Sequence, residues 1–192
     1  MKKLLSVLFL FFACAMSYGQ DAPDVTRFLG IPIDGTKAEM VSKLTAKGFT
    51  SVPGTDMLEG EFNGKDSYVG VQTNNRKVWR IWVSDKVGCD ETQIRINFNN
   101  LCRQFEENSK YINAMGDQTI PEGEDVGYEV NVHDKRYEAV FYQKSQVGND
   151  TADDLENRFV WFLIGKDPVN YGKYIISLYY ENRYNKANGE DL

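Results

Sequence analysis

Phe159-Val-Trp-Phe-Leu-Ile164 is an unbroken apolar run that predicts a strand inside a sheet. Successive side chains of a strand point to opposite faces, so this strand is apolar on both faces and we expect it to lie centrally. Further runs rich in aromatic and β-branched residues, at Arg136–Gln143 and Tyr174–Glu181, predict two more strands around it.

The segment before these strands fits two periods. Ile94, Ile96 and Phe98 alternate as in a strand, whereas Ile94, Phe98, Leu101 and Phe105 share one face of a helix. The helical pattern is longer and follows a capping-type start, Asp90-x-x-Gln93. We therefore predict a helix from Glu91 to Glu107.

Val126–Val132 is predicted to be a strand with one solvent-exposed face. Its valines and its tyrosine alternate with glycine, glutamate and asparagine. Such alternation is typical of an antiparallel strand that buries one face only.

The first half of the chain repeats this order. Thr36-x-x-Glu39 forms a capping box, an apolar stripe that includes Met40 and Leu44 follows, and Gly48 ends the predicted helix. Phe28–Ile33 predicts a short strand at a sheet edge, because Pro32 cannot donate a ladder hydrogen bond. Three further strands are predicted after the helix, the last two joined by a turn at Asn74-Asn75: Met57–Phe62, Tyr68–Thr73 and Val78–Val83.

This order predicts an α+β domain with two helices on one face of a single antiparallel sheet. Each half is a helix followed by a strand meander, over about residues 28–86 and 90–181. Residues 20–192 are expected to form one domain of a size that buries a sufficient core.

The first nineteen residues predict a signal peptide. Lys2 and Lys3 precede an apolar run from Leu4 to Ala13, and small residues lie just before Gln20. A membrane anchor is the alternative, although ten apolar residues span only about 15 Å as a helix. Lipidation at Cys14 is the other alternative. We expect a periplasmic or secreted protein.

Charge and cysteine content narrow the class of protein further. Without Lys2 and Lys3 the chain has 20 basic and 28 acidic residues, a net charge of −8, which disfavours a nucleic-acid partner.

Cys89 and Cys102 would lie about 15–20 Å apart along the predicted helix, too far for a disulfide. We expect two free thiols.

A family resemblance adds to this prediction. Gly30-Ile-Pro-Ile-Asp-Gly-Thr-Lys-Ala-Glu-Met-Val-Ser-Lys-Leu44, followed by a meander, resembles the start of the β-lactamase-inhibitor-protein-like fold, which small outer-membrane assembly lipoproteins share. The whole chain, with Phe98-Asn-Asn-Leu-Cys-Arg-Gln-Phe105 and its closing Tyr184–Leu192, resembles uncharacterised secreted proteins of gut anaerobic bacteria. The inhibitor-like fold implies a sheet face presented to a protein partner.

Residues for catalysis are sparse. The sequence has a single histidine, His133, beside Asp134 and without a third partner. It has no zinc-ligand spacing, Walker loop or dinucleotide-binding turn, so no cofactor is expected. Glu59 or Glu61 together with Glu138 is the carboxylate pair that a glycosidase would need.

One polar loop allows two interpretations. Its acidic residues could hold Ca²⁺, but their spacing misses the Asp-x-Asp-x-Asp-Gly pattern, and a solvated loop is the simpler interpretation: Asp150, Asp153, Asp154 and Glu156. Asp150-Thr-Ala152 also resembles the acceptor of a periplasmic O-glycosylation system, which makes Thr151 a candidate glycosylation site.

The strand Lys77–Val83 predicts a binding surface. If Trp79, Ile81 and Val83 point at the helices, then Val78, Arg80 and Trp82 point away from them, with Tyr68 on the paired strand. Trp, Tyr and Arg dominate protein interfaces, and aromatic rings also stack on sugars. The alternative is that a loop covers Trp82.

These features together predict an exported, non-catalytic protein that binds an envelope protein or glycan. A carboxylate-dependent periplasmic hydrolase is the alternative from another class. No nucleic acid partner and no membrane-spanning segment are expected, and the oligomeric state stays open.

Overall fold

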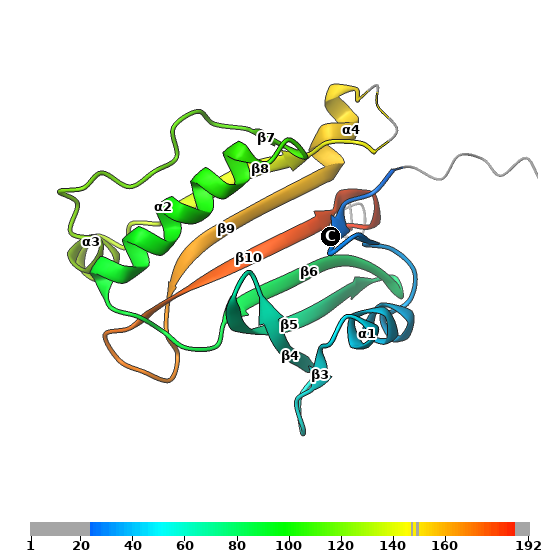
Figure 1. Ribbon diagram of the computed structural model, residues 1–192, viewed down its shortest axis with the longest axis horizontal. Coiled ribbons are helices and arrows are strands. Elements are labelled where there is room, and N and C mark those ends of the chain that lie inside the picture. The colour runs from blue at the N-terminus through cyan, green and yellow to red at the C-terminus, as the bar shows by residue number, and fades with distance from the viewer. Residues whose placement is uncertain (1–23, 147, 149, 187–192) are drawn as a thin grey trace, which may run out of the picture.

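The computed structural model shows an α+β protein built on an eight-stranded antiparallel sheet (Figure 1), and it describes residues 24–146, 148 and 150–186. The strand order is β3-β4-β5-β6-β10-β9-β8-β7. The strands are β3 (Thr50–Ser51), β4 (Met57–Phe62), β5 (Lys65–Asn74), β6 (Lys77–Asp85), β7 (Tyr111–Asn113), β8 (Glu138–Gln143), β9 (Arg158–Lys166) and β10 (Tyr174–Asn182). The predicted signal peptide at residues 1–19 lies outside the described residues.

The predicted pair of similar halves is visible in the topology. Helix α1 (Lys37–Ala46) is followed by the meander β3 to β6, and helix α2 (Glu91–Glu107) by the strands β7 to β10. The two meanders join where β6 pairs with β10. In Figure 1 both helices lie on the same side of the sheet. The predicted α+β fold is confirmed.

Local sequence explains both long helices. The side chains of Thr36 and Glu39 form the expected capping box at the start of α1, which satisfies amide groups that the first turn leaves free. The Asp90 carboxylate accepts a hydrogen bond from the backbone N–H of Gln93 at the start of α2. The helical pattern that begins at Ile94 is thus the correct one, and α2 has the predicted bounds.

The core fills the space between the sheet and these helices. Phe98 and Phe105 of α2 have ring centroids 5.0 and 5.7 Å from that of Phe162 on β9. Phe28, from the small hairpin of β1 (Arg27–Phe28) and β2 (Ile31–Pro32), packs 5.1 Å from Tyr180 on β10. Replacing one such buried Phe by Ala typically costs about 3–5 kcal/mol, so one apolar layer holds the helices, the hairpin and the sheet together.

The predicted hairpin between β5 and β6 forms, with its turn one residue later than the predicted Asn74-Asn75. Asn74 pairs with Lys77, and Asn75 and Arg76 both have positive φ, 46° and 65°. Positive φ at both central residues is the hairpin turn whose twist matches the flanking strands.

The strand predicted at Val126–Val132 is wrong, because this segment is helix α3. The Asp125 carboxylate accepts a hydrogen bond from the Tyr128 amide and starts the helix. Val126 and Val130 are buried one helical turn apart. A residue spacing of four satisfies a helix as well as a strand, and the Asp125 cap favours the helix.

The acidic loop also differs from the prediction. Ala152–Asn157 forms helix α4 at the start of β9, with Thr151 as its cap. The short η1 helix (Arg183–Asn185) follows β10. Among the described residues, no helix is long and apolar enough to cross a membrane.

Cys89 and Cys102 are both free, as predicted. Burial raises the pKa of the Cys102 thiol to about 12. Burial also raises the pKa of Cys89, although that side chain is only partly buried. Both environments favour the unreactive thiol over the thiolate.

Candidate binding face

The sheet has one face packed on the helices and one that we call the open face. Most residues that alternate with the core residues along the central strands are half-buried, whereas Gly70 and Glu181 are buried. The open face is made by outward-pointing residues of β5, β6, β10, β9 and β8, in register with one another: Tyr68, Gly70, Gln72, Arg80, Trp82, Ser177, Tyr179, Glu181, Phe159, Trp161, Leu163, Glu138, Val140 and Tyr142.

Three aromatic side chains form a row across this face. Trp82 pairs in register with Tyr179, and Tyr179 pairs with Trp161 on the next strand. The rings of Trp161 and Tyr179 are stacked, with centroids 4.2 Å apart and planes at 13°. A row of half-buried aromatic rings on a sheet face that α1 and α2 do not cover is an apolar surface suited to recognition.

The indole of Trp82 lies against the backbone of Gly70 on β5. A Cβ atom at Gly70 would be only 2.1 Å from Nε1 of Trp82 and 2.2 Å from Cε2. Only glycine leaves room for the ring at this distance.

Tyr68 lies two residues before Gly70, and the Lys86 ammonium is 5.3 Å from its ring centroid. A hydrogen bond to Glu59 raises the pKa of Lys86.

Arg80 is held in place by a buried carboxylate. Its Nη2 donates to Oε1 of Glu181 at 2.6 Å, and Nε1 of Trp161 donates to the same oxygen at 2.9 Å. The Arg80 guanidinium also lies 4.0 Å from the Trp79 ring centroid. Arg80 therefore orders neighbouring aromatic side chains as well as contributing charge to the open face.

The prediction that Val78 belongs to this face is wrong. Val78 is fully buried in the core. A register shift pairs Thr73 with Val78 but Gln72 with Arg80, so Trp79 is an extra residue in β6. Such a bulge reverses the alternation on one side of it. Arg80 and Trp82 lie beyond the bulge and keep the predicted orientation, whereas Trp79 contacts Arg80.

One end of the open face is hollowed into a cavity of about 240 Å³. It is lined by four strands, by Arg136 just before β8 and by the segment after β10: Arg80, Arg136, Glu138, Val140, Phe159, Trp161, Glu181, Arg183 and Lys186. The sequence pattern pointed to Arg80 as a surface residue but not to Trp161, because Phe159–Ile164 was predicted only as a central strand that is apolar on both faces.

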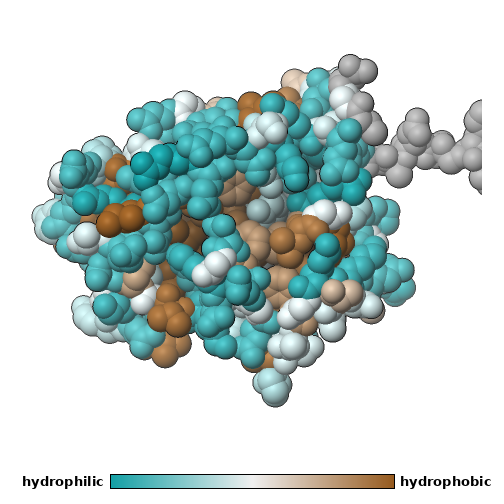
Figure 2. Space-filling model, viewed as in Figure 1, coloured by the Kyte–Doolittle hydropathy of each residue, from teal (hydrophilic) through white to brown (hydrophobic). Residues whose placement is uncertain are grey.

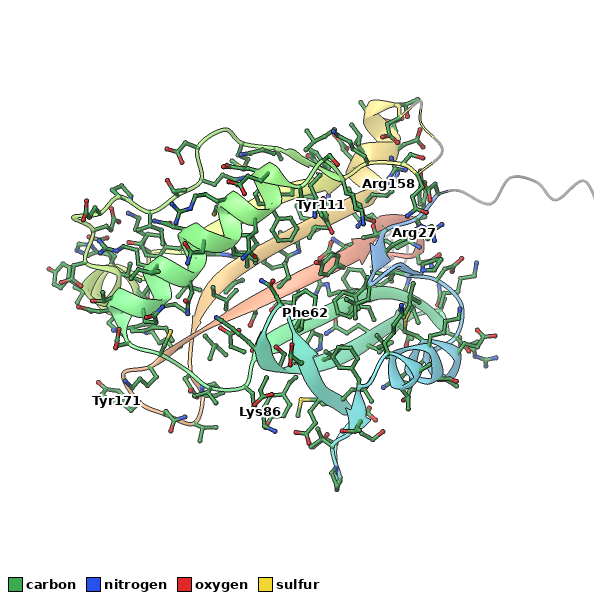
Figure 3. The ribbon with its side chains drawn as sticks, in the orientation of Figure 1. Arg27, Phe62, Lys86, Tyr111, Arg158 and Tyr171 are labelled. Atoms are coloured by element: carbon green, nitrogen blue, oxygen red, sulfur yellow. The ribbon has the colours of Figure 1, made fainter. Side chains whose placement is uncertain are left out.

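A second cavity lies on the helix side, between α2 and the β4–β5 hairpin. It comprises two adjoining hollows of about 320 and 140 Å³ that share Phe62, Asn63 and Gln104 among their linings. Asn63 donates a hydrogen bond of 2.8 Å to Gln104 across it. Figure 2 shows apolar residues in this hollow with hydrophilic ones around it, and Figure 3 labels Phe62 and Tyr111, which line it. No pattern in the sequence predicted this groove.

The carboxylate pair considered for a glycosidase is not brought together. Glu59 and Glu61 lie on β4 and Glu138 lies on β8, with four strands between them. Five interstrand spacings amount to roughly 24 Å, whereas glycosidase carboxylates are about 5–9.5 Å apart. Glu59 and Glu138 are instead bound to basic side chains, Lys86 and Arg136.

The remaining candidates lie apart from the open face. The His133 ring is exposed and contacts Glu129 at 3.1 Å. The part of the chain that the structure describes holds no group of His, Cys, Asp and Glu suited to a metal ion. Thr151 is exposed, and its hydroxyl donates to Asp154 at 2.7 Å within the capping box of α4. Its glycosylation stays a prediction.

Comparison with known proteins identifies no relative. No family model matches the chain, and neither the curated proteins nor the solved structures include a significant match.

Proposed function

We propose that this protein is an exported binding protein of the bacterial cell envelope, which recognises a protein or a glycan through its open face. The observation that carries the proposal is the row Trp82, Tyr179 and Trp161, half-buried on a face that α1 and α2 leave uncovered. Aromatic residues in such numbers on a sheet face that the described helices do not cover are costly to leave in water unless a ligand covers them.

Two features support recognition rather than simple packing. The rings are fixed before binding, since Trp82 is seated on Gly70 and Trp161 is tied to Glu181. A surface whose rotamers are already fixed loses less conformational entropy when it binds. Fixed aromatic side chains are the residues that contribute most to protein interfaces.

The test is retention of envelope components on the immobilised mature protein. Trp82→Ala should reduce retention at least about tenfold, the loss expected for truncating an interface anchor. Ile96→Ala is the matched control, because Ile96 is a large apolar side chain on α2 that is 43% exposed. Equal retention by wild type and Trp82→Ala would contradict the proposal.

A further inference from the structure

The hollow at the end of the open face carries an excess of positive charge. Its lining contributes four cations and two carboxylates, so two positive charges are in excess there: Arg80, Arg136, Arg183 and Lys186 against Glu138 and Glu181. The chain as a whole has a net charge of −6. A local field of the opposite sign in an acidic protein attracts an anionic ligand to this place.

The two carboxylates do not cancel this field. Glu181 is 2% exposed and accepts hydrogen bonds from Arg80, Arg183 and Trp161, so it serves to fix two guanidinium groups. Glu138 is bound to Arg136 at 2.7 Å. Lys186 makes no ion pair with any residue that the structure describes.

The cations lie on aromatic rings. The Arg183 guanidinium is 3.5 Å from the ring centroid of Phe159, and that of Arg136 is 5.3 Å from Trp161. A guanidinium stacked on a ring keeps its planar N–H donors directed sideways, where they match the two oxygens of an acid group. The hollow thus offers fixed donors beside apolar walls.

We propose that this hollow binds an acidic sugar residue, a saccharide ring that carries a carboxylate or sulfate group; the proposal rests on the binding function assigned to the open face. A cavity of about 240 Å³ is smaller than the pockets of about 300–1,000 Å³ that enclose a whole drug-sized ligand. It holds one residue of a longer chain, and the next residues lie on Trp161, Tyr179 and Trp82. An acidic peptide side chain would satisfy the cations but leave the rings uncovered.

The test is a panel of uronate-bearing and sulfated oligosaccharides, each paired with a neutral oligosaccharide of the same length. The mature protein should bind acidic members in preference to neutral ones. Binding should weaken as salt rises from about 50 mM to about 500 mM, because the Debye length shortens. The uronate and sulfate members show which acid group the site prefers.

Two pairs of variants assign the binding to the hollow. The double variant Arg136→Gln/Lys186→Gln removes two exposed cations that do not bind Glu181. It should raise the dissociation constant about tenfold. The double variant Lys43→Gln/Arg103→Gln makes the same charge change on α1 and α2, away from the open face, and should bind as wild type does. Lys186→Gln alone should give an intermediate loss.

Three results would overturn the proposal. They are equal binding of acidic and neutral saccharides, binding of a glutamate-rich peptide but of no saccharide, and binding of no member of either kind. Failure of the proposed envelope-binding function is a separate result: in that case wild type and Trp82→Ala retain envelope components equally. The acidic-sugar proposal can fail while Trp82→Ala still reduces this retention.

Discussion

A single methyl group added at Gly70 tests how the open face is built. The added Cβ would lie 2.1 Å from Nε1 and 2.2 Å from Cε2 of Trp82, whereas nonbonded atoms pack at about 3.5–4.0 Å. Gly70→Ala therefore forces the indole to move by roughly 1.4 Å or more from its seat on β5.

Two opposing effects set the magnitude. Overpacking of this kind costs about 1–3 kcal/mol, whereas Ala in place of a strand Gly stabilises by about 0.5–1 kcal/mol because the unfolded chain loses freedom. We expect Gly70→Ala to lower the free energy of unfolding by about 1–2 kcal/mol. The same change displaces Trp82 and should weaken binding by the open face.

Gly165 on β9 provides the matched control. The nearest atoms to its added Cβ are 3.9 Å away, an ordinary contact distance, so Gly165→Ala should leave stability unchanged or raise it by up to about 1 kcal/mol. Urea denaturation measures both free energies, provided that the m values agree. The indole N–H resonance of Trp82 should move in Gly70→Ala only. Equal stability of the two variants with an unmoved Trp82 resonance would refute the reasoning.

Three further predictions concern stability and reactivity. Glu181→Gln should destabilise the fold by about 2–3 kcal/mol, because it leaves two partly buried guanidinium groups, those of Arg80 and Arg183, without their carboxylate. Glu138→Gln removes an exposed ion pair and should cost below about 1 kcal/mol in chemical denaturation. Burial alone would raise the pKa of Asp24, but hydrogen bonds from Ser145 and Gln146 and the charges of Arg158 and Arg27 hold it below 3.8. A carboxylate whose pKa is lower in the folded than in the unfolded chain stabilises the fold at pH values above its unfolded pKa, and this contribution is lost as pH falls through its folded pKa. Urea unfolding should therefore show the free energy of unfolding decreasing below about pH 4. The decrease should be smaller in Asp24→Asn. Cys89 and Cys102 should react slowly with a maleimide at about pH 8 in the native protein and rapidly once unfolded; rapid native labelling of Cys102, measured by mass spectrometry of peptides, would contradict its burial.

Much of the fold follows from local sequence. Helix α2 was predictable to its bounds because Asp90 caps it and Ile94, Phe98 and Phe105 recur at helical spacing. The β5–β6 hairpin was predictable because Asn75 tolerates positive φ, although its turn lies one residue later than the predicted Asn74-Asn75. In both places the residues near in sequence decide the conformation.

Each of the two main errors involves contacts between segments that lie far apart in the sequence. Val126–Val132 fits both periods, and only its packing beside α2 and the Asp125 cap decide for a helix. Val78 was placed on the wrong face because a bulge depends on the register between two strands. Strict alternation within one strand carries no information about that register.

The candidate site was predictable only in part. Arg80, Trp82 and Tyr68 lie on the open face as expected from alternation in β5 and β6. Trp161 was recognised as part of an apolar strand but not as a surface residue, since a sequence apolar on both faces does not distinguish a covered face from a binding face. The cations of the hollow come from separate segments, so the sequence alone does not bring them together.

The most direct measurement of the central claim is photo-crosslinking in cells from single positions on opposite sides of the molecule. A photoreactive phenylalanine at position 82 or 142 reports on the open face, and one at position 96 reports on the solvent side of α2. If the open face binds an envelope component, positions 82 and 142 capture the same component, identified by mass spectrometry, and position 96 does not. Capture from position 96 alone, or no capture from either position on the open face, would contradict it.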